Sequence, residues 1–394
     1  MSLTLITLVA VLTMAIAGVG AVVEKWFSKR MRRKAFEAKH LTQYRFIRRL
    51  GAGGMGEVYL AEHRMLKRPC AIKLIQPARA CDSQVRARFE REVRMTAQLS
   101  HWNTVDIYDY GRTPAGTIFY VMEYLPGLNL QEMLERHGPL EPERVVHFLR
   151  QTCHGLREAH AKGLIHRDIK PGNIFAAQRG GLFDVAKILD FGLVKPVAEA
   201  RSPRLTQEGV ITGTPSFMSP EQACGVEHLD PRSDIYSLGA VGYALLTGRP
   251  PFAGRSSLAV LMAHARDEVL PPSKVCVDVP ADLEAVILRC LAKKPEDRFQ
   301  DVESLERALA ACSVANQWTQ AHAARWWEEK NATAAAPQEK GMAEETGQWA
   351  TSDAKSPCVM PSVTSNTDFG SNDVGLIGSL ECDRNSACLP ELAL

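Results

Sequence analysis

The sequence has little net charge and no grouping of cysteines that would build a disulfide framework. Its 394 residues carry a formal net charge of +2, so charge gives no support to a nucleic-acid partner. The ten cysteines are scattered, without a CxxC pair or zinc-type spacing. In a chain of this length, that pattern favours free thiols in a reducing compartment over a disulfide scaffold.

Charge is also missing from residues 3–23. A run of about 21 uncharged residues is long enough to cross a bilayer as a helix. A basic cluster follows at once, consisting of Lys25, Lys29, Arg30, Arg32, Arg33, Lys34 and Lys39. No basic residue precedes the run, so the positive-inside rule predicts an outside N-terminus and a cytoplasmic remainder.

A cleaved signal peptide is the alternative, with Ala15-Ile16-Ala17 as the cleavage site. It lacks a basic region before the apolar run, and its charge lies on the wrong side. We therefore expect a single membrane anchor over residues 1–24 and a basic juxtamembrane segment over residues 25–43.

Glycines interrupt two strand-like runs between Tyr44 and Ala61. The string Gly51-Ala52-Gly53-Gly54-Met55-Gly56 would let a hairpin backbone approach a ligand, and its N–H groups could cradle phosphate oxygens. A dinucleotide-binding glycine loop would open a helix, but Val58-Tyr59-Leu60 is strand-like. Taken alone, the glycines fit an ordinary turn as well as a phosphate cradle.

Lys73 lies in the middle of the apolar strand predicted over residues 70–75. A buried, unpaired ammonium is disfavoured, so the lysine either reaches water from an edge strand or has an acidic partner. A helix is predicted over residues 84–99, where Phe89, Val93 and Ala97 form an apolar stripe. Glu92 lies on or near that stripe, so we expect it to pair with Lys73.

A polar stretch, His166 to Asn173, lies between short apolar runs. Burying its acid, amide and guanidinium groups is costly unless they have partners. A second acid follows in Asp190-Phe191-Gly192, at the end of the apolar run 185–189. Two acids and an asparagine suit Mg²⁺, which takes oxygen ligands and shares them with phosphates.

The remaining pattern predicts a strand-rich first part and a helical second part, with the boundary near residues 123–127. Further strands are predicted over 107–111 and 118–123, and helices over 142–162, 233–246, 282–291 and 302–312. Gly163 fits the position after a helix end, and Ser233 fits an N-cap. Beyond 312 the composition favours a disordered tail, in which Trp318, Trp326 and Trp327 indicate a short docking helix.

With these motifs in this order, the chain resembles the eukaryotic-like (Hanks-type) serine/threonine protein kinases, of the bacterial membrane-anchored kind. The resemblance covers about residues 44–311. It implies an α+β, bilobal fold over residues 44–312, with a small antiparallel β lobe (44–123, one main helix) and a larger helical lobe (128–312). The motifs are the glycine string, Ala71-Ile72-Lys73, Glu92, His166 to Asn173, Asp190-Phe191-Gly192, Ser219-Pro220-Glu221, Asp234 and Arg298.

The resemblance also implies a role for each motif residue. The catalytic residues would be Asp168, Lys170, Lys73 and Glu92, and the Mg²⁺ (or Mn²⁺) ligands Asn173 and Asp190. Glu221 and Arg298 would form a buried ion pair, and Asp234 would hold the catalytic loop from beneath. ATP would be bound by Leu50, Gly51, Ala52, Gly53, Gly54, Met55, Gly56, Glu57, Val58, Ala71, Lys73, Met122, Glu123 and Leu125.

Lys170, two residues after Asp168, matches the serine/threonine class, and Thr214 resembles part of the shelf that receives a protein substrate. The family's arginine before the catalytic aspartate, here Arg167, binds a phosphorylated loop. We therefore expect autophosphorylation at Thr206 first and Thr212 second, with a kinase homodimer as the partner arrangement.

Two other functions fit a related fold. A pseudokinase or signalling scaffold would lack one of the residues that bind ATP and metal, whereas Lys73, Asp168, Asn173 and Asp190 are all present. A small-molecule kinase would not need the segment 213–221, which serves peptide substrates in the family. An active protein kinase with protein substrates is the leading interpretation.

Overall fold

The structure, a computed structural model, describes residues 41–53, 56–75, 93–113, 117–191, 215–254 and 256–335, with side chains up to residue 330. These residues belong to one compact unit, which ends at Ala336. Residues 1–40, which contain the predicted anchor, lie outside these ranges. So do Gly54, Met55, Glu92, Thr206, Thr212 and Thr214. Within the described ranges, no helix is both long and apolar enough to cross a membrane.

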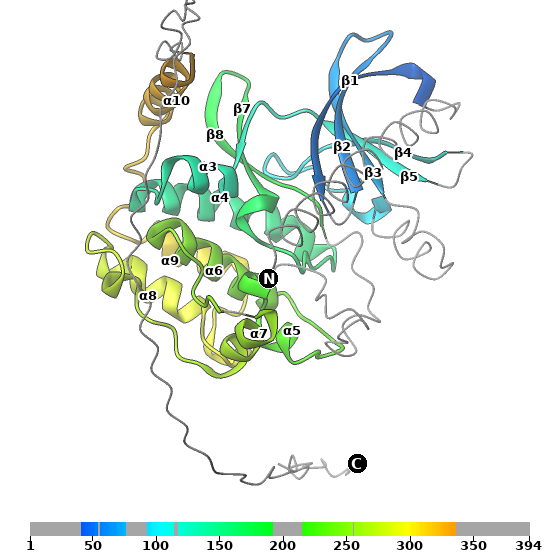
Figure 1. Ribbon diagram of the computed structural model, residues 1–394. Coiled ribbons are helices and arrows are strands. Elements are labelled where there is room, and N and C mark those ends of the chain that lie inside the picture. Colours follow the sequence, from blue (N-terminus) through cyan, green and yellow to red (C-terminus); the bar gives the residue numbers. More distant parts are fainter. Residues whose placement is uncertain are drawn as a thin grey trace, which may run out of the picture. The chain divides into compact units, whose positions relative to one another are not determined.

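The small lobe is a five-stranded antiparallel sheet with the order β1-β2-β3-β5-β4 (Figure 1). A short 3₁₀ turn, Leu41–Gln43, precedes it. Its strands are β1 (Tyr44–Gly53), β2 (Gly56–His63), β3 (Pro69–Ile75), β4 (Ile107–Arg112) and β5 (Ile118–Glu123). The strand predicted over 118–123 is therefore confirmed.

The small-lobe sheet is covered on both faces, because side chains alternate across a strand. Ile72 and Leu74 of β3 join one apolar cluster with Phe119 and Val121 of β5. Ala71 and Ile75 join the other cluster, which also contains Ile118, Tyr120, Met122 and Val93. Lys73 pairs with Tyr120 in the β3–β5 register, so the two side chains share the second face.

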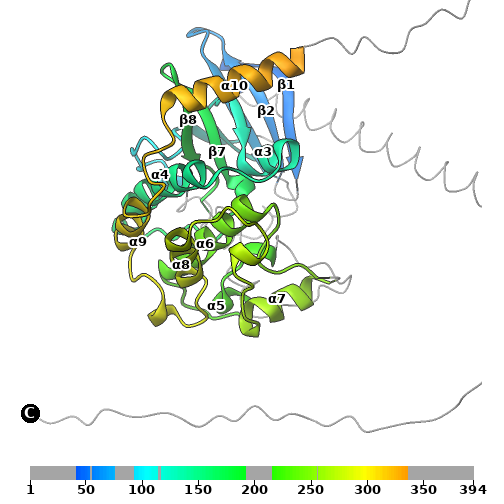
Figure 2. The ribbon, with the colours of Figure 1, turned by 90° about the vertical axis from the view of Figure 1, so that its left-hand side faces the viewer.

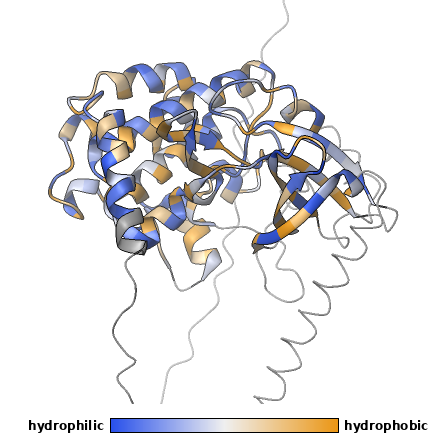
Figure 3. Ribbon diagram, turned by 90° about the horizontal axis from the view of Figure 1, so that it is seen from above, coloured by the Kyte–Doolittle hydropathy of each residue, from blue (hydrophilic) through white to orange (hydrophobic). Residues whose placement is uncertain are grey.

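The large lobe is mainly helical. Its helices are α3 (Leu130–His137), α4 (Pro142–Ala161), α5 (Pro220–Ala223), α6 (Arg232–Thr247), α7 (Ser257–Arg266), α8 (Ala281–Cys290), α9 (Val302–Ala310) and α10 (Gln320–Ala335). A small sheet with the order β6-β7-β8 is made of β6 (Gly127–Asn129), β7 (Ile174–Arg179) and β8 (Leu182–Ile188). Apolar and polar residues are interspersed along the strands and helices of both lobes (Figure 3).

The long helix predicted over 142–162 is present as α4, and Gly163 follows it with a left-handed φ of 71°. The helix predicted over 233–246 is α6, but its predicted N-cap is wrong. The helix begins at Arg232, with Pro231 in the cap position. Ser233 is inside the first turn, and its hydroxyl donates to Glu221 (2.6 Å).

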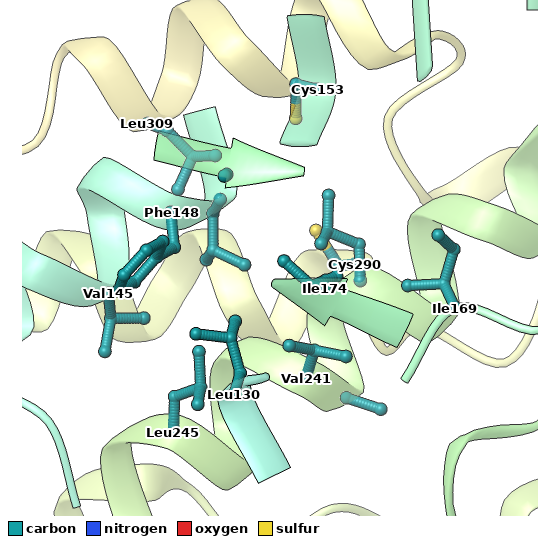
Figure 4. Close-up of a cluster of buried hydrophobic side chains, with 14 of the residues drawn as sticks. Leu130, Val145, Phe148, Cys153, Ile169, Ile174, Val241, Leu245, Cys290 and Leu309 are labelled. Carbon is teal, nitrogen blue, oxygen red and sulfur yellow. The ribbon is translucent and has the colours of Figure 1, made fainter. Parts of the chain in front are cut away.

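Helix α6 forms the centre of the large-lobe core. Its residues from Ser233 to Leu246 are all buried, which is the pattern of a helix surrounded by other elements. Side chains of α8 pack directly against two glycines of α6, where a larger residue would clash. A Cβ on Gly239 would lie 2.5 Å from Cys290, and one on Gly242 would lie 2.6 Å from Ile287. Figure 4 shows part of this core, where Val241 and Leu245 lie among side chains of α4, α9 and β7.

The chain stays ordered past the end predicted for the large lobe. Residues 313–335 continue the fold, and α10 contains Trp326 and Trp327. The expectation of disorder from residue 313 is therefore wrong for 313–335. The expected helix is present with Trp326 and Trp327, whereas Trp318 lies before its start. Its packing depends on partners far away in the sequence, which composition alone does not reveal.

Candidate active site

The polar stretch His166 to Asn173 forms the loop between α4 and β7, and Asp234 of α6 holds it. The Asp234 carboxylate accepts the backbone N–H groups of His166 and Arg167, each at 2.8 Å. His160 lies 2.9 Å from the same carboxylate. Burial alone would raise the pKa of Asp234, but the hydrogen bond and charge of His160 hold it below its ordinary value. The loop is thus fixed from beneath by one buried acid.

Three side chains converge on Asp168 within that loop. Lys170 Nζ lies 2.9 Å from Asp168 Oδ2. Asn173 Nδ2 donates to the same oxygen (3.0 Å) and to the Asp168 backbone carbonyl (2.8 Å). The Asp168 N–H in turn donates to His166 Nδ1 (3.2 Å). These bonds orient the Asp168 carboxylate while leaving its side chain 10% exposed.

Asp190 connects this loop to the small lobe through two hydrogen bonds. Its Oδ2 accepts from Lys73 Nζ of β3 at 2.6 Å, and its Oδ1 accepts from the buried Tyr120 hydroxyl of β5. Burial would raise the pKa of Asp190, but the charge and hydrogen bond of Lys73 hold it below the ordinary value. Burial, with Asp190 adding to the effect, raises the pKa of Tyr120.

The backbone conformation and hydrogen bonds around Asp190 fix its position. Asp190 has a left-handed φ of 52°, a conformation that is uncommon outside glycine and concentrates at functional sites. The next residue, Phe191, is buried, and its ring centroid lies 4.7 Å from that of His166. The backbone N–H of Leu189, the residue before Asp190, donates to the Asn173 carbonyl (2.9 Å). Asp190 and Asn173 therefore belong to one connected backbone unit.

The predicted pair of Lys73 with Glu92 stays a prediction, because Glu92 lies outside the described residues. In the described structure, Lys73 pairs with Asp190. Sequence reasoning did not identify Tyr120. The signal that could have found it is strand alternation, because Tyr120 is the cross-strand neighbour of Lys73 on the same face.

The predicted phosphate cradle is the β1–β2 hairpin, in which Leu50, Gly51, Ala52 and Gly53 are exposed. Gly56 opens β2 with a φ of 143°, and a Cβ there would lie 1.9 Å from the Leu74 carbonyl oxygen. Only glycine fits that position. Glu57 is held by Arg49 (3.2 Å) and by the Tyr59 hydroxyl (2.6 Å), while Val58 packs against the second apolar cluster.

The segment that joins the lobes begins at Glu123, which precedes Leu125. Met122, just before it, is buried and pairs with Ala71 across β3 and β5. Glu123 Oε1 accepts from Lys187 Nζ (2.8 Å) and from the Asp106 N–H (3.0 Å). Its Oε2 accepts from Arg179, which also binds Asp106 (3.1 Å). Lys187 is fully buried on β8 and also donates to the Thr104 carbonyl (3.0 Å). We call Glu123, Lys187, Arg179 and Asp106 the hinge network.

The large lobe carries a second predicted pair. Arg298 donates to both oxygens of Glu221, at 2.8 and 2.9 Å, and it also bonds the Ala292 and Lys293 carbonyls. Burial alone would raise the pKa of Glu221, but Arg298 holds it below the ordinary value. The ion pair predicted from the resemblance is therefore present.

The oxygen donors suit a hard divalent cation. Asp190 supplies a carboxylate, and Asn173 supplies an amide oxygen, which are ligand types that Mg²⁺ takes together with water and substrate phosphates. No group of three or more His, Cys, Asp or Glu side chains suited to a metal occurs among the described residues. A site of two protein ligands completed by phosphates is the type that the donor set fits.

Comparison with known proteins agrees with this geometry. The family model for the protein kinase domain matches residues 44–310. Serine/threonine-protein kinase PknB of Mycolicibacterium smegmatis is 40% identical over 275 residues, covering 69% of this chain and 43% of that protein. Serine/threonine-protein kinase Pkn1 of Myxococcus xanthus is 43% identical over 266 residues, covering 68% of this chain and 38% of that protein.

Among solved structures, the PknI kinase domain of Mycobacterium tuberculosis aligns with a TM-score of 0.53 at 29% identity, covering 68% of this chain and 94% of that chain. The chain thus spans about two fifths of the length of the curated relatives that it matches, at 43% for one and 38% for another. It matches nearly the whole of the solved kinase domain.

Proposed function

This chain belongs to the bacterial Hanks-type serine/threonine protein kinases, and we propose that it transfers the γ-phosphate of ATP to serine and threonine hydroxyls of proteins. One observation carries the proposal. Lys170 and Asn173 both bond Asp168 Oδ2, and Asp190, which follows β8, bonds Lys73 of β3. A pseudokinase would have no need for all of these groups together.

Asp168 is the group that orients the substrate hydroxyl and accepts its proton. Its carboxylate is fixed by Asn173 and Lys170, and positioning of this kind supplies most of the catalysis in phosphoryl transfer. Lys170 steadies the transferred phosphate. Asn173 and Asp190 hold Mg²⁺, or Mn²⁺ in its place, and such a cation neutralises charge on the phosphates when it is bound.

The adenine and the phosphates lie between the glycine hairpin and the hinge. Leu50 to Val58 cover the phosphates, Ala71 and Met122 line the adenine pocket, and Glu123 and Leu125 offer backbone groups to its edge. Lys73 binds the α- and β-phosphates, which requires its ammonium to turn from Asp190 toward the nucleotide. Glu92 is its proposed partner in that arrangement.

A direct test uses labelled ATP, Mg²⁺ and a bacterial lysate as a source of protein substrates. Asp168→Asn removes the proposed base and should abolish labelling. Asp278→Asn makes the same chemical change at an exposed loop position and should leave labelling unchanged. Equal labelling by Asp168→Asn and the unaltered protein would defeat the proposal.

We also propose regulation by phosphorylation of the loop before the substrate shelf. Thr206 and then Thr212 receive phosphate from a second copy in a homodimer, and Arg167 pairs with it. Thr214 belongs to the shelf that receives the substrate. Mass spectrometry of active protein should find phosphate on one or both threonines, and an active protein without loop phosphate would contradict this proposal.

The proposed location is the inner face of a membrane, with one helix over residues 1–24 and the kinase domain in the cytoplasm. The support is the uncharged run followed by a basic cluster. Proteolysis of end-tagged protein in intact cells tests the topology. A C-terminal tag cleaved from outside would overturn it.

A further inference from the structure

Residues 313–330, which we call the tryptophan segment, lie beyond the matched kinase domain and dock on the large lobe. The family match ends at residue 310, whereas this segment continues through a turn into α10. In Figure 1, α10 lies beside the β7–β8 hairpin, and Figure 2 shows it crossing the ends of β7 and β8. Ala323 and Trp327, one helical turn apart, are its buried residues among those described.

The segment completes a buried ion pair. Arg144 of α4 donates to both oxygens of Asp184 on β8, at 2.9 and 3.0 Å, and both side chains are 0% exposed. The indole N–H of Trp318 donates to Asp184 Oδ2 (3.0 Å), and that of Trp327 donates to Oδ1 (2.7 Å). Each carboxylate oxygen therefore has one guanidinium donor and one indole donor.

The same segment covers the cation. The Arg144 guanidinium carbon lies 3.8 Å from the Trp326 ring centroid and 4.8 Å from the Trp318 centroid. Arg144 thus lies among aromatic faces, to which a desolvated cation is attracted. A buried ion pair is stable only when its geometry and its remaining hydrogen bonds are satisfied. Here the tryptophans supply the cover for Arg144 and the additional donors to Asp184, while Arg144 Nη1 is buried without a hydrogen-bond partner among the described residues.

The tryptophan segment makes a second contact, in which Gln320 bonds the backbone of β8. The Phe183 N–H donates to Gln320 Oε1 (2.8 Å), and Gln320 Nε2 donates to the Phe183 carbonyl (3.0 Å). The Gln320 amide therefore bonds the start of β8 as a neighbouring strand would. Helix α4 holds the next carbonyl of β8, because His147 and Gln151 both contact the Asp184 carbonyl oxygen at 3.0 Å.

The held strand leads directly to the ATP site. Lys187, three residues after Asp184, binds Glu123 at the hinge. Asp190 follows two residues after β8 ends at Ile188. The tryptophan segment thus fixes one end of β8, and the other end presents the hinge lysine and the proposed metal ligand.

We propose that the tryptophan segment is a positioning element of the ATP site, which acts through β8. Its indole donors keep the Arg144–Asp184 pair closed, and the closed pair keeps β8 in place for Lys187 and Asp190. Without those donors, two buried acceptor positions on Asp184 lose their partners and the start of β8 loosens. This inference rests on the proposed function only in taking the ligand to be ATP.

The full chain with Trp318→Phe and Trp327→Phe tests the proposal, since phenylalanine keeps an aromatic ring and removes the N–H. Trp326→Phe is the matched control, because Trp326 covers Arg144 with its ring. The probe is a fluorescent ATP analogue with Mg²⁺, and binding is titrated on folded protein. We expect the double variant to raise the Kd of the analogue about tenfold, as outer-shell changes typically do. Trp326→Phe should change it less than twofold.

Two further readouts separate positioning from simple loss of folded protein. Hydrogen exchange of the backbone amides in residues 182–188 should become faster in the double variant and not in Trp326→Phe. In turnover assays, KM for ATP should rise while kcat per folded molecule stays within about twofold. An unchanged Kd with only less folded protein would overturn the proposal. Because binding is measured without turnover, a chain that binds the analogue but transfers no phosphate would refute only the proposed function.

Discussion

Replacing Lys187 with methionine keeps most of the side-chain length and removes its charge from the hinge network. The Lys187 ammonium is fully buried, 2.8 Å from Glu123 Oε1 and 3.0 Å from the Thr104 carbonyl. Removing one partner of a buried ion pair costs about 3–5 kcal/mol, because the other charge stays buried. Glu123 keeps Arg179 and the Asp106 N–H as donors, so we expect a loss near the lower limit, about 3 kcal/mol.

The assay is urea unfolding at pH 7, followed by intrinsic fluorescence. Lys274→Met is the matched control, since Lys274 is exposed and its loss should change the unfolding free energy by less than about 0.5 kcal/mol. The double variant Lys187→Met with Glu123→Leu removes both charges. It should cost less than the sum of the single variants by about 1–3 kcal/mol. A Lys187→Met cost below about 1 kcal/mol, or strict additivity in the double variant, would refute the reasoning.

Three other perturbations test the site and the core. Asp168→Asn should lower kcat about 10²–10⁴-fold in a peptide-kinase assay, with the unfolding transition retained. Tyr120→Phe removes a donor to Asp190, so the Mg²⁺ concentration for half-maximal binding of an ATP analogue should rise about tenfold. Burial lowers the pKa of His264 to about 4 in the folded chain, compared with about 6.5 in the unfolded chain. As pH falls below about 6.5, the unfolded chain is therefore protonated at His264 before the folded chain is. Wild type should therefore lose about 2 kcal/mol between pH 8 and pH 5 that His264→Gln does not lose, and equal losses in urea unfolding would contradict this origin.

Local patterns predicted the elements whose side chains follow a simple period. Strand β5 was predictable to the residue because an apolar run is bounded by turn signals, and α4 was predictable to within one residue because its apolar stripe ends before Gly163. The N-cap of α6 was not, because hydrogen bonding begins before Ser233: the Asp230 side chain accepts the Arg232 N–H (2.8 Å), and the Asp230 carbonyl accepts the Ser233 N–H (3.0 Å).

The resemblance to a family predicted partners where a motif names both of them. The Glu221–Arg298 pair and the support of the catalytic loop by Asp234 are both present in the structure. Tyr120 has no such motif, and its contact with Asp190 depends on how two lobes meet. The chain itself gives the face on which Tyr120 lies, but not the acid that it faces.

The buried charges show why sequence reasoning stops where it does. Lys187 and Asp184 are recognisable in the sequence as charges within an apolar strand, a pattern that requires partners. Their partners lie elsewhere in the chain. Lys187 bonds Glu123 at the hinge and the Thr104 carbonyl, and Asp184 bonds Arg144 on α4 and the indoles of Trp318 and Trp327 beyond the matched domain. Since β8 carries both charges, the hinge and the tryptophan segment are joined by one strand. A substitution that breaks either the Lys187–Glu123 pair or the Arg144–Asp184 pair should therefore also weaken the other pair. This coupling is a property of the tertiary structure, and no single segment of the sequence contains it.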